Sequence, residues 1–220
     1  PSEVEVSWKR LVNLGYTHDY LGEDLISDDQ MLELYPQDFI VAKNAGDYFV
    51  RTTQFIDDLL VRYYDMEPYY NVSSPEDLVG HLICALAPHT SGGVLSRIIG
   101  WADCSGGYAH PLFHASKRRN CDGDEACVMM LMDGLLNFSR QFLPDRRGSR
   151  TMDAPLVLSS LLIPAEIDDE VHGMDIVWKY PLELYEAALE YKNPWDVNIR
   201  QVVNVLDTPA QYEGMGYTHE

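Results

Sequence analysis

The chain has 220 residues, an apolar fraction of 46 %, a charged fraction of 23 % and a formal net charge of −19. This composition is typical of a folded protein with a sizeable core, and the chain has no run of eighteen apolar residues that could cross a membrane. So negative a charge argues against nucleic acid as a partner of the whole domain. The chain has no initiating Met and no signal-peptide pattern, so we expect both ends to be cuts in a longer protein.

The charge is unevenly distributed along the chain. Residues 117–150 carry seven basic and five acidic residues, a local net of +2, whereas the remaining residues carry 9 basic and 30 acidic residues, a net of −21. The window ends in a basic turn at residues 146–150. This turn could bind phosphate or could be an ordinary solvated loop, and the two interpretations are equally supported. Residues 117–150 as a whole are less acidic than the remainder of the chain.

The cysteines exclude two kinds of stabilising site. Cys84, Cys104, Cys121 and Cys127 form no C-x-x-C pair, so neither a structural zinc site nor a disulfide framework is indicated. We expect reduced thiols that serve packing, as in a cytoplasmic protein.

Hydrophobic periodicity and turn signals predict an α+β chain. Strands are expected at residues 4–8, 78–86, 155–163 and 174–178, extended chain at residues 108–115, and loops at residues 87–93, 101–107 and 167–172. Helices are expected at residues 27–34, 47–64, 94–99, 125–142 and 181–191, and the helix at 125–142 is expected to be the longest. We divide the chain into an acidic helical segment at residues 1–70 and a larger segment at residues 71–220.

Two other patterns carry weaker signals. The glycine-rich loop that ends at Gly93 could hold a phosphate on free N–H groups, although a plain loop is the better interpretation. His110 and His114 are four apart, but Pro111 and the lack of a Glu beside the first His argue against a zinc-protease site.

The most informative stretch is an acidic loop at residues 120–125 that follows three cations. Asn120, Asp122 and Asp124 are spaced by two, so their side chains can converge on one side of a tightly looped chain, and Gly123 lets the backbone bend. Oxygen ligands of this kind suit Mg²⁺, or Mn²⁺ in its place, shared with substrate phosphates. The adjacent cations would offset that charge; they are Lys117, Arg118 and Arg119.

An ordinary structural role competes with the metal site. Asp124 could be the N-cap of the helix expected from residue 125, with the acids favouring the helix dipole. An EF-hand is excluded, because the glycine stands at the fourth loop position and the twelfth position is Leu131 rather than Glu. The residues by themselves leave metal site and helix cap about equally supported.

Longer motifs carry a resemblance to a known family. The run His110-Pro-Leu-Phe-His-Ala-Ser-Lys-Arg-Arg-Asn-Cys-Asp-Gly-Asp-Glu125 resembles the large, catalytic subunit of the archaeal family D DNA polymerases. So do Phe55-Ile-Asp-Asp-Leu-Leu-Val-Arg-Tyr-Tyr64, Leu86-Ala-Pro-His-Thr-Ser91, Leu135-Leu-Asn-Phe-Ser-Arg140 and Met152-Asp-Ala-Pro-Leu-Val-Leu158. The similarity extends from Gly15 to Glu220. It departs from the family pattern at Ala126-Cys127, where another acid is often seen.

The resemblance implies much of a double-psi β-barrel with surrounding helices, and a part in Mg²⁺-dependent transfer of dNTPs to a primer 3′-hydroxyl during DNA replication. Asp122 and Asp124 would be the catalytic metal ligands, with Asn120 assisting, and Lys117, Arg118 and Arg119 would contact nucleotide or DNA phosphate. The implied partners are primer–template DNA and a small exonuclease subunit. We expect little activity from this chain alone. The alternatives are a structural, protein-binding segment whose loop only caps a helix, and a metal-dependent nuclease.

Overall fold

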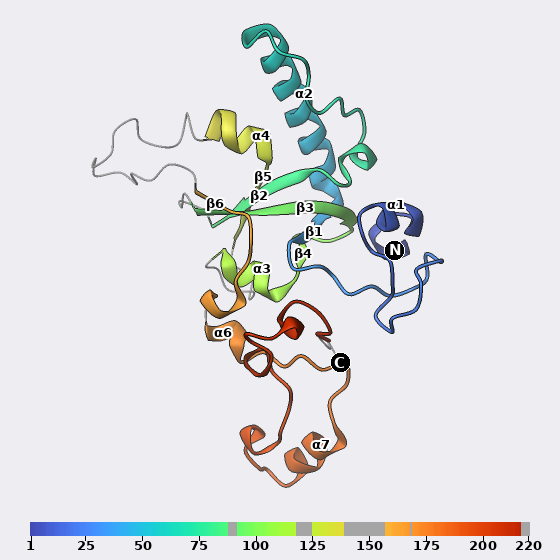
Figure 1. Ribbon diagram of the computed structural model, residues 1–220, viewed down its shortest axis with the longest axis vertical. Helices are drawn as coiled ribbons and strands as arrows, with labels where there is room; N and C mark the ends of the chain where they lie inside the picture. The colour runs from blue at the N-terminus through green and yellow to red at the C-terminus, as the bar shows by residue number, and fades with distance from the viewer. Residues whose placement is uncertain (88–91, 118–124, 139–156, 168, 217–220) are drawn as a thin grey trace, which may run out of the picture. The chain divides into compact units, whose positions relative to one another are not determined.

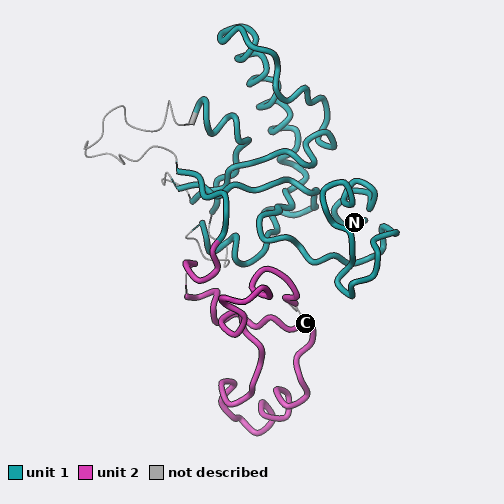
Figure 2. Tube along the Cα trace, in the orientation of Figure 1, with its two compact units in different colours: residues 1–162 teal, residues 163–220 magenta. Residues whose placement is uncertain are grey.

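A computed structural model describes residues 1–87, 92–117, 125–138, 157–167 and 169–216 of the chain. The chain divides into two compact units, Pro1–Leu162 and Ile163–Glu220 (Figure 2). The mixed sheet and its helices lie in the first unit, and the second unit consists of short helices and irregular segments. The α+β class expected from the sequence is therefore confirmed.

One mixed sheet organises the first unit, with strand order β4-β1-β3-β2-β5 (Figure 1). The long strand β3, Gly92–Ala102, lies at its centre, and β2, Leu82–Leu86, pairs with it in antiparallel fashion. On the far side of β2 lies β5, Cys127–Met130, also antiparallel. The side chains of β2 from Ile83 to Leu86 are almost fully buried, as a central strand requires.

The other edge of β3 is shared by two strands placed end to end. β1, Asp38–Ala42, runs parallel to residues 97–102, and β6, Val157–Ser159, runs parallel to residues 92–94. Gln37 bridges the junction, because its Nε2 donates to the carbonyls of Leu95 at 2.8 Å and Ser160 at 3.2 Å. The short strand β4, Tyr108–Ala109, completes the sheet beyond β1.

The longest described helix is α2, Gly46–Tyr63, at the position that the sequence predicts. Its buried face is formed by Val50, Thr53, Ile56 and Leu60, which recur at helical spacing. After the helix, the Asp57 carboxylate accepts three backbone N–H groups, those of residues 69, 70 and 71, each at 2.8 Å. The chain then enters the 3-10 helix η3, Pro75–Leu78, through a capping box on Ser74 and Asp77.

A buried ion pair joins β1 to β3. Arg97 donates to both oxygens of the Asp38 carboxylate, at 2.9 Å from Nε and 2.7 Å from Nη2, and its Nη1 donates to the carbonyl of Leu14 at 2.9 Å. The Tyr16 hydroxyl donates to the same carboxylate at 2.5 Å, and its ring stacks on that of Tyr35. Burial, reinforced by the charge of Asp38, raises the pKa of Tyr16 far above its usual value, so the hydroxyl remains a donor.

The second unit is built of short helices around a small core. Its helices include α6, Asp169–His172, and α7, Leu182–Leu189, with 3-10 turns at Pro164–Glu166, Pro194–Asp196, Val202–Asn204 and Pro209–Gln211. The core contains Val171, Ile176, Val202, Val205 and Met215. An isolated bridge joins Asp175 to Gln201, so the short strand expected at 174–178 is reduced to one residue pair.

Several expected elements are wrong in type. Residues 94–99 belong to strand β3 rather than to a helix, because β2 pairs with residues 94–97 on one edge and β1 pairs with Arg97 and Ile98 on the other. Residues 2–4 and 8–13 form the helices η1, Ser2–Val4, and α1, Trp8–Asn13, rather than a strand. Residues 27–34 form no helix; the Gln30 side chain instead accepts the amides of Ile26 and Ser27. Residues 167–172 end in α6 rather than in a loop.

Breaking the ion pair between Arg97 and Asp38 tests how much of the first unit depends on it. Asp38 is 3 % exposed, so Arg97→Met leaves a buried carboxylate without its cation. We expect a loss of about 3–5 kcal/mol in the free energy of unfolding of the 220-residue chain, measured in urea. The matched control is Lys43→Met, which breaks the exposed pair with Glu5 and should change the free energy of unfolding far less. Equal losses in both variants would contradict the central place of the buried pair.

Candidate functional site

Four strand ends meet at one end of the sheet in the first unit. The registers pair Leu86, the last residue of β2, with Gly93 of β3 and with Cys127, the first residue of β5. Gly92 pairs in turn with Val157, where β6 begins. The segments 88–91, 118–124 and 139–156 are each joined to this end through neighbouring described residues. The sheet therefore places Cys127, which follows the acidic loop in the chain, and Val157, which follows the segment 139–156, at the same end.

The base of this sheet end is packed and apolar. Cys84, Leu86 and Met129 form a buried cluster, and Cys127 and Leu158 pack against it. Burial raises the pKa of the Cys84 thiol to about 11, and burial is also the main cause of the raised pKa of Cys127. Both thiols are therefore protonated at neutral pH and serve packing, as the sequence predicts.

Helix α3, Pro111–Ser116, leads into the acidic loop from the other side. It is a helix where the sequence predicts extended chain, because Pro111 occupies the first helical position and His110 is the N-cap. Two of its own residues, Leu112 and Phe113, are fully buried. Their burial holds the end of the helix at which the chain enters the acidic loop.

Lys117, at the end of α3, is the predicted phosphate ligand that the structure describes. It is 5 % exposed, and its Nζ lies 5.3 Å from the ring centre of Phe113 and 6.0 Å from that of Phe39. The two rings also contact each other edge to face. The ammonium group is thus held against aromatic faces, an arrangement worth about 2 kcal/mol when desolvated. Its assignment to phosphate stays a prediction.

Two histidines belong to this helix: the N-cap His110 is buried, and His114 is partly buried. His110 accepts the Leu112 amide on Nδ1 at 3.1 Å, and burial followed by the nearby His114 lowers the pKa of His110 to about 4. Burial and the charge of Lys117 lower the pKa of His114 to about 4 as well. Both imidazoles are therefore neutral at physiological pH.

The remaining predicted site residues lie outside the described residues. These are Arg118, Arg119, Asn120, Asp122 and Asp124. The basic turn at 146–150 also lies outside them. Within the described part of the chain, no group of three or more His, Cys, Asp and Glu side chains is arranged to hold a metal ion.

The segment after the acidic loop differs from the prediction in a way that affects the site. The helix expected at residues 125–142 is wrong at its start: Glu125 and Ala126 are irregular, and Cys127–Met130 is strand β5. Helix α4, Leu131–Asp133, and a π-helical turn at Gly134–Phe138 follow only afterwards. The helix that Asp124 was expected to cap therefore does not begin at residue 125.

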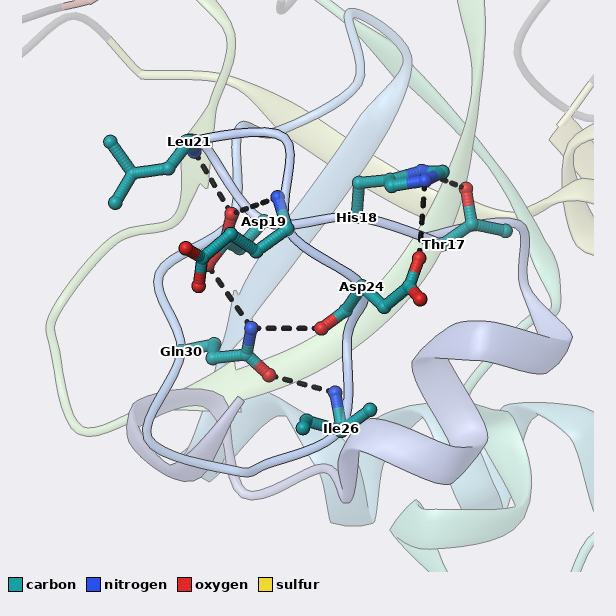
Figure 3. Close-up of polar contacts among 8 residues, drawn as sticks. Thr17, His18, Asp19, Leu21, Asp24, Ile26 and Gln30 are labelled. Carbon is teal, nitrogen blue, oxygen red and sulfur yellow. Dashed lines mark hydrogen bonds and ion pairs between the residues drawn. The ribbon is translucent and has the colours of Figure 1, made fainter.

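A second polar cluster, at residues 17–30, is structural (Figure 3). The Asp19 carboxylate accepts the amides of Leu21 and Glu23 at 2.9 Å and the side-chain amide of Gln30 at 3.1 Å. Desolvation acts to raise the pKa of Asp19, but the hydrogen bonds from Gln30 and the loop amides together lower it. His18 lies 3.4 Å from Asp24 across an exposed bridge. These carboxylates stabilise the loop that contains them. The end of the sheet is therefore the stronger candidate for a functional site.

The chain matches the family described as DNA polymerase II large subunit DP2, catalytic domain, over residues 1–220. It is 54 % identical to the DNA polymerase II large subunit of Archaeoglobus fulgidus, and the similarity covers the whole chain and 19 % of that protein. The chain belongs to this family. The proteins of the same name from Pyrococcus furiosus and Methanococcus vannielii are 53 % and 54 % identical over the whole chain, which covers 18 % and 20 % of their lengths.

The resemblance drawn from the sequence motifs is therefore confirmed at the level of the family. The chain spans about a fifth of the length of the curated relatives it matches. Within the described residues, no helix combines the length and the apolar character needed to cross a membrane. The sequence motifs identified the family. They gave no sign of the network of Tyr16, Asp38 and Arg97, because these residues lie far apart in the chain and follow no local pattern.

The two lowered histidine pKa values predict a pH dependence of stability. Because the folded-state pKa of about 4 lies below the unfolded value of about 6.5, the contribution is fully present above pH 6.5 and is lost as the pH falls towards 4. The double variant His110→Asn/His114→Gln should therefore weaken the loss of unfolding free energy between pH 7 and pH 4.5, measured by urea unfolding of the 220-residue chain at both pH values.

The matched control for this measurement is Gln54→Asn, which alters a side chain of the same unit that carries no titratable group. It should leave the pH dependence as in the parent chain. A double variant with an unchanged pH dependence would show that the two imidazoles do not titrate as described.

Proposed function

We propose that this chain supplies the acidic metal-binding loop of a DNA-directed DNA polymerase large subunit, and that the loop takes part in transfer of a nucleotide to a primer 3′-hydroxyl. The observation that carries the proposal is strand β5, which begins two residues after Glu125. Because that segment is a strand paired with β2, the acids have no helix to cap at this point. Family membership supports the polymerase reaction, since the relatives are named DNA polymerase large subunits.

The donor set fits Mg²⁺. Asp122 and Asp124 supply carboxylate oxygens and Asn120 an amide oxygen, the hard ligands that this ion prefers. When bound, Mg²⁺ would activate the primer hydroxyl and neutralise charge on the phosphates during in-line displacement. The chain's own part is to hold three side chains on one loop, between the buried end of α3 and the paired start of β5.

The cations beside the loop have two proposed roles. Arg118 and Arg119 would contact phosphate oxygens of the nucleotide or DNA, since guanidinium groups bind phosphate in a bidentate manner. Lys117 is buried with its ammonium group near the rings of Phe113 and Phe39, and we propose that its charge offsets that of the loop carboxylates. We further propose that primer–template DNA and a small subunit bind the full-length protein.

We also propose that the sheet belongs to a double-psi β-barrel. Two features support it: β3 has parallel partners, β1 and β6, on one edge, and it has an antiparallel partner, β2, on the other. The acidic loop would then enter the barrel through β5.

Charge removal in the loop tests the reaction. In the full-length subunit assembled with its partner, Asp122→Asn and Asp124→Asn should each lower primer extension about a hundredfold or more, because each removes an anionic ligand that acts in the transition state. The matched control is Asp133→Asn in α4, which should change the rate only a few-fold. Near-normal extension by either loop variant would refute the proposal.

The products separate polymerase from nuclease, which is the alternative use of the same carboxylates. Added pyrophosphate should release dNTPs from primed DNA by reversal of synthesis, and Asp122→Asn should abolish this release. Release of dNMPs that Asp122→Asn abolishes would instead assign hydrolysis to the loop, because an exonuclease in the partner subunit would not respond to that variant.

Metal binding can be tested on the 220-residue chain itself. Titrated Mn²⁺ should broaden the amide resonances of residues next to the loop, such as Lys117 and Glu125, because an unpaired-electron centre at the carboxylates would lie near them. Asp122→Ala should abolish the broadening, whereas Asp133→Ala should retain it. Broadening that survives in Asp122→Ala would place the metal elsewhere on this acidic chain.

A further inference from the structure

The helix α7 in the second unit exposes an apolar stripe. Leu182, Tyr185 and Leu189 are spaced by three and four, which places them on one face, and they are 67 %, 51 % and 82 % exposed. Ala187 is the buried residue of this helix. Trp195, in the adjacent 3-10 helix η6, Pro194–Asp196, is 80 % exposed. The helix therefore shows more apolar surface to solvent than it contributes to its own core.

Tyr191 is a second, independent observation that indicates a binding role for this face. It is 97 % exposed and has a φ of 54°, the left-handed region that β-carbon-bearing residues rarely adopt. Its amide donates to Ala188 and that of Lys192 to Ala187, the pattern of a helix C-terminus that glycine normally completes. A tyrosine here is conformationally unfavourable and buries nothing in return.

The charge around the apolar stripe limits the classes of molecule that can bind to it. Glu183, Glu186, Glu190 and Asp196 are all exposed, and Lys192 forms an ion pair with Glu190. By sequence, residues 163–220 carry 12 acids and three bases, a net of −9. Repulsion therefore disfavours nucleic acid, anionic lipid and a second copy of this unit. Residues 1–162, with 23 acids and 13 bases, are also a poor electrostatic match.

We propose that the face formed by α7, Tyr191 and Trp195 is a docking surface for a cationic protein segment with apolar side chains, carried by a separate polypeptide. Leu189, Tyr191 and Trp195 act as the apolar anchors, since exposed aromatic residues that become buried carry much of the energy of an interface. The surrounding carboxylates select a basic partner and speed its association. This surface is distinct from the proposed polymerase loop, and the proposal does not depend on that function.

Two labelled helical peptides of about 18 residues serve as probes, one of leucine and lysine and one of leucine and glutamate. Binding to the 220-residue chain is measured by fluorescence anisotropy at ~0.15 M salt. The lysine peptide should bind and the glutamate peptide should not. Tyr191→Gly and Trp195→Ser should each raise the Kd about tenfold or more, whereas the matched controls Tyr48→Ser and Phe55→Ser, on the exposed face of α2, should leave the Kd within about twofold.

The thermal midpoint distinguishes docking from folding. Tyr191→Gly should keep or raise the midpoint, because glycine adopts the left-handed conformation without strain. A lowered midpoint together with weaker binding would mean that Tyr191 serves the fold. Equal weakening by the α2 variants would mean diffuse electrostatic attraction. Either result, or unchanged binding by both α7-face variants, overturns the proposal.

The full-length subunit provides the last test. With a photo-reactive benzophenone amino acid at position 195, cross-linking in the purified assembled polymerase should join this site to a basic segment of another polypeptide. Cross-links confined to the subunit's own chain would show that the face is covered internally, and would overturn the choice of partner.

Discussion

The fold of the first unit depends on the pairing of Asp38 with Arg97. A parallel strand pair gains nothing from a hairpin, so β1 must be held against β3 by contacts between distant residues. The ion pair does this at the first register position and also accepts the Tyr16 hydroxyl and reaches the carbonyl of Leu14. This buried ion pair thus holds the N-terminal segment, β1 and the central strand β3 together.

The sequence predicted two helices well, one from a long repeating apolar face and one from a proline at its start. The helix of 18 residues at Gly46–Tyr63 has a repeating apolar face, and residues 182–189 follow a helix-starting proline. Errors fell on apolar stretches of four to eight residues, including the first part of the long helix expected at 125–142, because such stretches look alike in a buried strand and a buried helix. Residues 127–130 and 94–99 are strands because β2 supplies partners for both, and that information lies elsewhere in the chain.

The candidate site shows a similar division. Spacing alone identified Asn120, Asp122 and Asp124 as oxygen donors but left their role undecided, because a helix cap uses the same residues. The strand pairing of Cys127–Met130 removes that competing role at the point where it was expected. The buried setting of Lys117 could not have been predicted, since a basic run by itself indicates solvent exposure and the aromatic rings beside it come partly from β1.

The end-to-end arrangement of β1 and β6 along β3 bears on how the protein is made. Gln37 and Ser160, joined by a hydrogen bond, are separated by 123 positions in the chain. A nascent chain emerges at about 5–20 residues per second. The part of the β3 edge that pairs with β6 therefore stays unpaired until β6 has been synthesised. An open edge on a buried strand is a site for pairing with other chains. During the interval between the synthesis of β3 and that of β6, residues 92–94 therefore have an open edge that can pair with other chains.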